Sequence, residues 1–176
     1  EKCPTKVTDD FNMGLGQRKA IYKHFPQAVP AAYVIDPEHC RLFKGKKCGV
    51  CQKTCKAKAV NYEQKDQEIL LEVGAVIMAT GFDLYNVSAL TEYGWGQIAN
   101  VLTAMQFERM ICASGPTQGH LKRPSDGKEP KTLAFIQCVG SRDVRHKRYC
   151  SAVCCMHATK EAILAHEHYP NLSSTI

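Results

Sequence analysis

The sequence predicts a mixed fold of the α+β or α/β class, and three observations predict it. Continuous apolar runs at 75–79 and 132–137 are typical of buried strands. Residues 150–168 combine an alanine-rich face with a leucine- and isoleucine-bearing face, which is typical of a helix. Between 36 and 59, cysteines replace any hydrophobic period, so a bound metal rather than a core is expected to organise this stretch.

The first predicted part, residues 1–66, is expected to contain little regular structure, because glycines and prolines interrupt its first 31 residues. Residues 17–24 are compatible with a short helix, and 32–35 with a short strand. The apolar stretches 60–64 and 69–73 flank a polar turn. They predict a β-hairpin that leads into the second part.

The second predicted part covers residues 67–176. A helix is expected over 103–112 with Thr103 as its N-cap, and the glycine- and proline-rich stretch 114–131 is expected to be a surface loop. A polar loop, 138–149, then separates the last expected strand from the last expected helix. Strand, glycine turn and helix in that order are half of a βαβ unit.

Bulk properties exclude several functional classes. The 176 residues are 44% hydrophobic, and no apolar run approaches the roughly 20 residues of a membrane span, so we expect no membrane insertion. The net charge is +6, but basic residues are not interleaved with aromatic ones, so we expect no nucleic-acid partner. The start Glu1-Lys2-Cys3-Pro4 lacks both methionine and a secretion signal, which predicts a piece of a longer protein.

Ten cysteines point either to disulfides or to metal. Cys48, Cys51 and Cys55 crowd together, and the adjacent Cys154 and Cys155 make a poor disulfide, so the spacing favours metal in an oxygen-poor cytoplasm. Many lysines adjoin the first cysteine group. They either offset the negative charge of a thiolate-bound cluster or form a solvated face: Lys44, Lys46, Lys47, Lys53, Lys56 and Lys58.

The row Cys40-x7-Cys48-x2-Cys51-x3-Cys55 is close to the ferredoxin pattern in which closely spaced thiolates wrap a [4Fe-4S] cube. Structural zinc is the main rival, although zinc sites usually use two separated cysteine pairs. A redox dithiol at Cys48 and Cys51 is a third interpretation, which the flanking cysteines disfavour.

The fourth ligand of this cluster is expected to be Cys3. In two-cluster ferredoxins the fourth cysteine of each run binds the other cluster and usually precedes proline, as Cys3 precedes Pro4. Cys55 would then belong to a second cluster whose other ligands lie upstream, although Lys56 stands where proline is usual. If Cys3 is not in place, Cys55 is the alternative fourth ligand.

A second cysteine group, Cys138, Cys150, Cys154 and Cys155, falls where a dinucleotide-binding fold would carry its glycine loop, but G-x-G-x-x-G is absent. We expect a metal cluster here, with Cys150 and Cys154 one helical turn apart on one face. Buried structural thiols are the alternative. Cys112 is expected to be a core thiol, and no histidine is expected to be a ligand.

The apolar run that ends in Ala79-Thr80-Gly81 resembles the turn of thioredoxin-reductase-type flavoproteins, where small residues let the backbone approach FAD. The resemblance implies a fold in which a ferredoxin-like [4Fe-4S] insertion precedes part of a thioredoxin-reductase-like, FAD/NAD(P)-type two-domain flavoprotein. Without other motifs, a buried strand with a tight turn is an equally simple interpretation.

Several motifs occur together from one end of the chain to the other, and their combination resembles the A subunit of heterodisulfide reductase. Besides both cysteine groups and Ala79-Thr80-Gly81-Phe82, they are Gly14-Leu15-Gly16-Gln17-Arg18, Phe25-Pro26-Gln27-Ala28-Val29-Pro30, Phe107-Glu108-Arg109-Met110, Arg123-Pro124-Ser125-Asp126-Gly127-Lys128 and Cys138-Val139-Gly140-Ser141-Arg142-Asp143.

This resemblance implies an electron-relay subunit that carries FAD and [4Fe-4S] clusters and that can split electron pairs between two acceptors. It implies as partners the other heterodisulfide reductase subunits with an electron-donating hydrogenase or dehydrogenase, or a quinone-interacting membrane subunit. The chain would cover the middle of such a subunit, would be inactive alone, and none of its residues is expected to be catalytic. A zinc-stabilised interaction module without redox activity is the alternative function.

Overall fold

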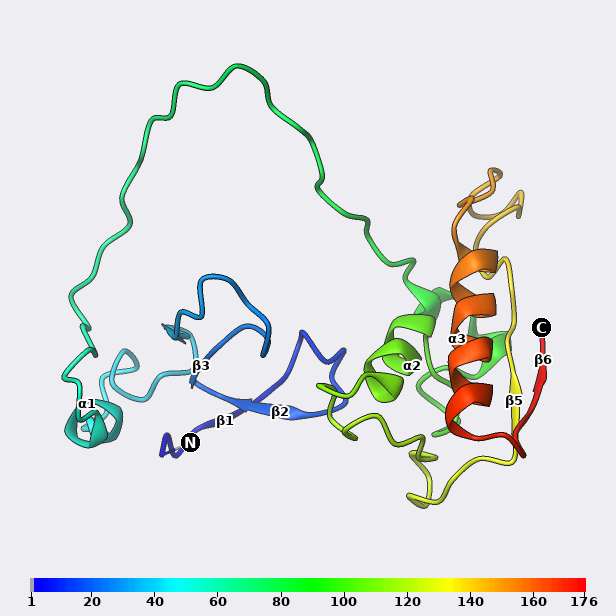
Figure 1. The fold of residues 1–176 in the computed structure, drawn as a ribbon, viewed down its shortest axis with the longest axis horizontal. Coiled ribbons are helices and arrows are strands. Elements are labelled where there is room, and N and C mark those ends of the chain that lie inside the picture. Colours follow the sequence, from blue (N-terminus) through cyan, green and yellow to red (C-terminus); the bar gives the residue numbers. More distant parts are fainter. Residues whose placement is uncertain (1) are drawn as a thin grey trace.

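The chain begins with two antiparallel strands, β1 (Lys6–Thr8) and β2 (Gln17–Lys19), in the computed structural model, which describes residues 2–176. The Asp9 N–H donates to the carbonyl of Gly16 at 3.0 Å and closes the connection between them. Gly14 lies inside this connection with φ +77°, a left-handed conformation that glycine adopts without steric cost. The connection brings residues 11–13 out toward the second half of the chain (Figure 1).

A second antiparallel pair follows, β3 (Ile21–Tyr22) with β4 (Val34–Ile35). The predicted strand at 32–35 is therefore present in shortened form, whereas the predicted helix at 17–24 is wrong. Strands on both sides, β1 and β4, supply hydrogen-bond partners to these residues, and such tertiary pairing outweighs a weak local helix propensity. The first helix, α1 (Val50–Thr54), carries the middle of the cysteine row.

Residues 56–86 contain no helix or strand and run as a long arc between the two halves (Figure 1). The predicted hairpin at 60–64 and 69–73 and the predicted buried strand at 75–79 are therefore wrong for this structure. Ile77 is 91% exposed. Within residues 2–176 no strand lies beside this segment, and a strand needs a neighbour to receive its backbone hydrogen bonds and cover its side chains.

The second half contains two 3₁₀ turns, η1 (Val87–Ala89) and η2 (Thr91–Tyr93), followed by the helix α2 (Ala104–Ile111). The predicted helix at 103–112 is confirmed, and Thr103 is its N-cap. The Thr103 hydroxyl accepts from the Gln106 N–H at 3.2 Å, and the Gln106 side chain accepts from the Thr103 N–H at 2.9 Å. This reciprocal capping box satisfies two amides that the helix itself leaves free.

A βαβ unit ends the chain: β5 (Thr132–Ala134), α3 (Cys154–His168) and β6 (Ser173–Thr175), with β5 and β6 parallel. The predicted half-unit of strand, glycine turn and helix is thus completed by a second strand, β6, which pairs with β5. The predicted loops at 114–131 and 138–149 also contain no helix or strand. The start of the last helix was predicted one turn too early, because Ala152 has φ +63° and no right-handed helix contains that conformation.

The helix α3 packs against α2, with β5 and β6 beside it (Figure 1). A single cluster of buried apolar residues joins these elements: Phe107, Met110, Ile111, Leu121, Ala165 and Leu172. The mixed α/β class is therefore confirmed. The ferredoxin-like and thioredoxin-reductase-like assignments, and the boundary at residue 66, stay predictions.

Contacts from the β1–β2 connection tie the first half to α2. Arg109 Nε donates to Asn12 Oδ1 at 3.0 Å, and its guanidinium lies 4.6 Å from the centre of the Phe11 ring. Gln106 Nε2 donates to the Met13 carbonyl at 3.3 Å. In the part of the chain described here, no helix combines the length and the apolar character needed to cross a membrane.

Candidate metal-cluster sites

One pocket in the first half is lined by four of the predicted ligands, Cys3, Cys40, Cys48 and Cys51. They come from different elements, because Cys3 precedes β1, Cys40 follows β4, and the other two cysteines flank the start of α1. Apolar side chains complete the lining, among them Ile21, Ile35 and Val50. The fold therefore gathers four thiols that are spread over about fifty residues of sequence.

Asp36 organises the turn that presents Cys40. Its carbonyl accepts from the Cys40 N–H at 2.9 Å, and its carboxylate accepts from Arg18 Nη2 at 3.0 Å. Burial would raise the pKa of Asp36, but the hydrogen bonds from Arg18 and His39 outweigh burial and lower it. A charged Asp36 thus links β2 to the cysteine turn.

Cys55 is not among the residues that line this pocket. It is the C-cap of α1, and its sulfur accepts from the Ala59 N–H at 3.4 Å. Cys3 therefore lines this pocket, whereas Cys55 does not.

The described cysteine sulfurs are not arranged around a single tetrahedral ion in this structure. Ligands of a tetrahedral zinc ion with Zn–S bonds of about 2.3 Å lie roughly 3.8 Å apart. Within residues 2–176, no three cysteine sulfurs lie within 4.8 Å of one another. A donor set of four cysteines is one that a [4Fe-4S] cluster accepts, and structural zinc accepts the same set.

Tyr62 contacts this site and was not predicted from the sequence. Its hydroxyl lies 2.8 Å from Cys51 Sγ. Burial raises the pKa of Tyr62 to about 12, and the neighbouring Cys51 adds to this rise, so the phenol keeps its proton at neutral pH. The six lysines around this site are all exposed, and no salt bridge among the described residues includes any of them.

The second cysteine group also comes together. Cys138 follows β5, Cys150 lies in the loop before α3, and Cys154 and Cys155 are the first two residues of that helix. The prediction that Cys150 shares the first helical turn is wrong, since the turn at Ala152 separates it from the helix.

Cys154 and Cys155 have pKa values that depend on the other members of the group. A hydrogen bond from Ser151 lowers the pKa of Cys154, and the Cys138 backbone contributes to this. The negative charge of Cys154 raises the pKa of Cys155, and the charges of Cys138 and Cys150 act in the same direction. The pKa shifts of Cys154 and Cys155 thus have their causes within this group of cysteines and the neighbouring Ser151.

Gly140 allows the chain to turn between Cys138 and the loop. It has φ +69°, and a Cβ atom at this position would lie 2.5 Å from the Tyr85 ring. The Tyr85 hydroxyl lies 2.8 Å from His146 Nδ1, in the same loop. The end of the linker thus packs against the cysteine loop at a point where only glycine fits.

The remaining predicted residues have different surroundings. Ala79, Thr80 and Gly81 lie in the extended segment and are exposed, so these residues by themselves do not enclose a flavin. Gly81 has φ +76°, which agrees with a turn at this point. Cys112 is half-buried rather than a core thiol; it caps α2 and lies 3.3 Å from Ser114 Oγ.

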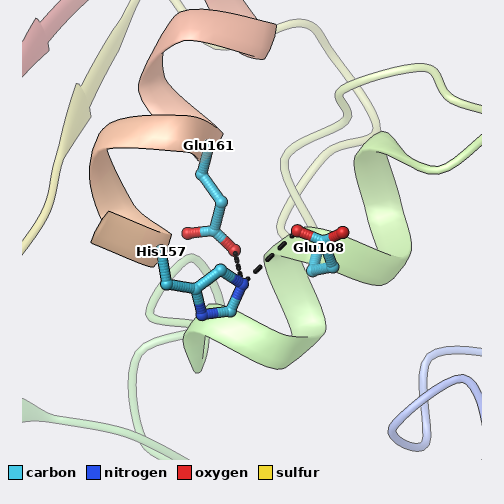
Figure 2. A group of neighbouring side chains, drawn as sticks. All are labelled: Glu108, His157 and Glu161. Carbon is cyan, nitrogen blue, oxygen red and sulfur yellow. Dashed lines mark hydrogen bonds and ion pairs between the residues drawn. The ribbon is translucent and has the colours of Figure 1, made fainter. Parts of the chain in front are cut away.

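A third group of polar side chains joins α2 and α3: Glu108, His157 and Glu161 (Figure 2). Burial raises the pKa of Glu161 to about 8, and the negative charge of Glu108 adds to the rise. Burial also acts on Glu108, but the hydrogen bonds and charges of Lys160 and His157 together outweigh it and lower the pKa of that carboxyl. The sequence signal for this group was the spacing of His157 and Glu161, which places them one helical turn apart.

Comparisons with known proteins support the resemblance of the motifs. The chain is 50% identical over 170 residues to the iron–sulfur A subunit of the CoB–CoM heterodisulfide reductase of Methanocaldococcus jannaschii, which is 96% of this chain and 25% of that protein. It is 53% identical to the A subunit of the H(2)/formate:CoB-CoM heterodisulfide,ferredoxin reductase of Methanococcus maripaludis. This match covers 96% of this chain and 25% of that protein. It is 47% identical to the A subunit of the ferredoxin/F(420)H(2)-dependent CoB-CoM heterodisulfide reductase of Methanosarcina acetivorans, over 99% of this chain and 21% of that protein.

No protein-family model matches the chain. The chain spans about a quarter of the length of the curated relatives that it matches. A mixed α/β fold that carries two groups of cysteines, together with these relatives, defines the class as a segment related to iron–sulfur subunits. Within that class, the chain belongs to the family of heterodisulfide reductase A subunits.

Proposed function

We propose that this chain is the part of a heterodisulfide reductase-type subunit that relays electrons through two [4Fe-4S] clusters. The observation that carries the proposal is the pocket lined by Cys3, Cys40, Cys48 and Cys51, whose donors suit a cubane. Such clusters would supply one-electron transfer. The chain's own residues hold the thiols in place, exclude water with apolar side chains and keep a phenol proton next to Cys51.

Cys138, Cys150, Cys154 and Cys155 would hold the second cluster. Cys55 would serve a further cluster together with ligands outside this chain, as the ferredoxin pattern implies. A cluster with four thiolates carries net negative charge, so the exposed lysines near the first site would stabilise its reduced form.

The finer proposal is electron exchange with FAD near Ala79, Thr80 and Gly81, including a division of electron pairs between two acceptors. Its support is the turn at Gly81 and the sequence resemblance. The exposed segment does not form a flavin site by itself, so we derive no step through FAD from the residues described here.

The names of the relatives mention H(2), formate, ferredoxin and F(420)H(2). We propose that this protein works with the remaining heterodisulfide reductase subunits and with a hydrogenase or dehydrogenase of that kind in the cytoplasm. A quinone-interacting membrane subunit is the alternative partner.

The deciding experiment is anaerobic reconstitution of the chain, followed by iron, sulfide and zinc analysis and a visible spectrum. About four irons and four sulfides per cluster, with a broad band from thiolate-to-iron charge transfer, are expected. Colourless protein with bound zinc and no sulfide would instead establish the zinc-stabilised module.

A further inference from the structure

The side chains of Glu108, His157 and Glu161 converge between two packed helices (Figure 2). Glu108 comes from α2, whereas His157 and Glu161 are one turn apart on α3. His157 Nε2 lies 3.4 Å from Glu108 Oε2 and 3.3 Å from Glu161 Oε1. One atom from each residue falls within 4.8 Å of the other two.

Glu161 is the unusual member of this group. Its side chain has 0% exposure, yet neither carboxylate oxygen accepts a hydrogen bond from the described residues. A buried carboxylate without hydrogen bonds is costly, because it has lost water and gained no replacement. Figure 2 shows one oxygen of this carboxylate pointing toward His157, on the side where Glu108 also lies. The missing partner of Glu161 therefore belongs at the centre of the group.

We propose that Glu108, His157 and Glu161 form a site for a single divalent first-row transition-metal ion. Ligands about 2.1 Å from a tetrahedral ion lie roughly 3.4 Å apart, which agrees with the two measured separations of 3.3 and 3.4 Å. Two carboxylates and one imidazole are a donor set that manganese, iron and zinc accept. Three protein ligands leave a fourth position open for water.

The charges and the exposure fit this assignment. Lys160 Nζ donates to both oxygens of Glu108, at 2.8 and 3.0 Å, but no lysine or arginine pairs with Glu161 in the described residues. A divalent ion would balance both carboxylates. His157 and Glu108 are 26% and 27% exposed, so an ion can reach the group, and Lys160, which is 53% exposed, can turn into solvent when it does.

The test is titration of Mn²⁺ into the cluster-reconstituted protein, followed by electron paramagnetic resonance of free Mn²⁺. Carboxylates suit Mn²⁺ and thiolates do not, so binding reports this group rather than the cysteine sites. One bound Mn²⁺ per chain is expected. Glu161→Gln should weaken binding more than about tenfold, since even outer partners of metal ligands contribute that much. Glu167→Gln, an exposed position on the same helix, should leave binding unchanged.

Two further variants keep the test decisive if Glu161→Gln unfolds the protein. Glu108→Gln, at a partly exposed position, should also weaken Mn²⁺ binding more than about tenfold. Lys160→Met should strengthen binding, because it removes the ammonium that competes for Glu108. Absence of Mn²⁺ binding, or equal binding by Glu108→Gln and Glu167→Gln, would overturn the proposal. Because no cysteine takes part, either result leaves the proposed clusters unaffected.

Discussion

The two cysteine groups differ in how the fold protects them. In the first group Cys40 is 9% exposed, and apolar side chains and Tyr62 line the same pocket. In the second group Cys150 and Cys155 are exposed, and the thiols stand at the open N-terminus of α3. Burial and solvent access are among the factors that set the potential of an iron–sulfur centre. The same ligand type is therefore expected to give two centres with different potentials and different sensitivity to solvent.

The largest expected effect is the loss of iron and sulfide when Cys40, but not Cys55, is replaced. Cys40→Ser should lower the iron and sulfide content of reconstituted protein by about four each, because it removes a ligand of a cubane. Cys55→Ser is the matched control and should leave the content unchanged, since Cys55 is not among the residues that line the pocket. Loss of a cluster in Cys55→Ser but not in Cys3→Ser would reverse the assignment of the fourth ligand.

The second group can be perturbed without changing a thiol. Gly140→Ala should lower the free energy of unfolding by about 2–4 kcal/mol and reduce iron binding at the second group, because φ is positive and the new Cβ would meet the Tyr85 ring. Thermal unfolding and iron analysis measure both effects. Gly127→Ala, with φ +71° and nothing within 4 Å, should cost only about 1 kcal/mol and leave iron unchanged. Equal losses would show that the Tyr85 contact is unimportant.

Asp36 lies next to the first group, because its carbonyl accepts from the Cys40 N–H at 2.9 Å. Asp36→Asn should lower the free energy of unfolding at pH 7 by about 1–3 kcal/mol, because it breaks the ion pair with Arg18. The pKa of Asp36 is lower in the folded chain than in the unfolded chain. Its contribution is therefore fully present above the ordinary carboxyl pKa of about 4 and is lost as the pH falls through the folded value.

Chemical denaturation of the parent protein and the Asp36→Asn variant from pH 7 to pH 3 checks this dependence. The difference in unfolding free energy between the two proteins should shrink on acidification. Asp10→Asn is the control, since Asp10 is 88% exposed and lies 3.9 Å from Arg18. A difference that stays constant with pH would contradict the charged role of Asp36.

The smallest expected effect concerns Tyr62. Tyr62→Phe removes the hydroxyl beside Cys51 Sγ, and hydrogen bonds to cluster sulfurs favour the reduced form. The reduction potential of the first centre should fall, while that of the second centre should stay unchanged. A redox titration that follows both centres in the same sample provides this internal comparison, and an equal shift of both would rule out a local effect.

Some elements were predictable because their signals are local. The helix α2 has its capping residue Thr103 and its apolar spacing within about ten residues, and both were found where the sequence placed them. The strand β5 and the helix α3 were also predictable, apart from the start of α3, which depends on the left-handed Ala152. A positive φ at alanine has no sequence signal, because glycine and asparagine are the residues that usually adopt it.

Other elements were not predictable because their partners are distant. Gln17–Lys19 is a strand because β1 pairs with it, and residues 75–79 are exposed because no described strand pairs with them. Likewise, Glu108 and Glu161 are far apart in sequence and meet only because α2 packs on α3. Cross-strand and interhelical contacts of this kind leave no period in the local sequence.

The sequence by itself determined the family and the mixed α/β class and predicted the cysteine donor set, because motifs, thiol spacing and apolar periodicity are read along the chain. The tertiary structure decided which thiols share a pocket, that Cys55 stands apart from it and that a buried carboxylate faces a histidine and a second carboxylate. These outcomes depend on burial and on separations between atoms from different elements, and such quantities exist only once the chain has folded.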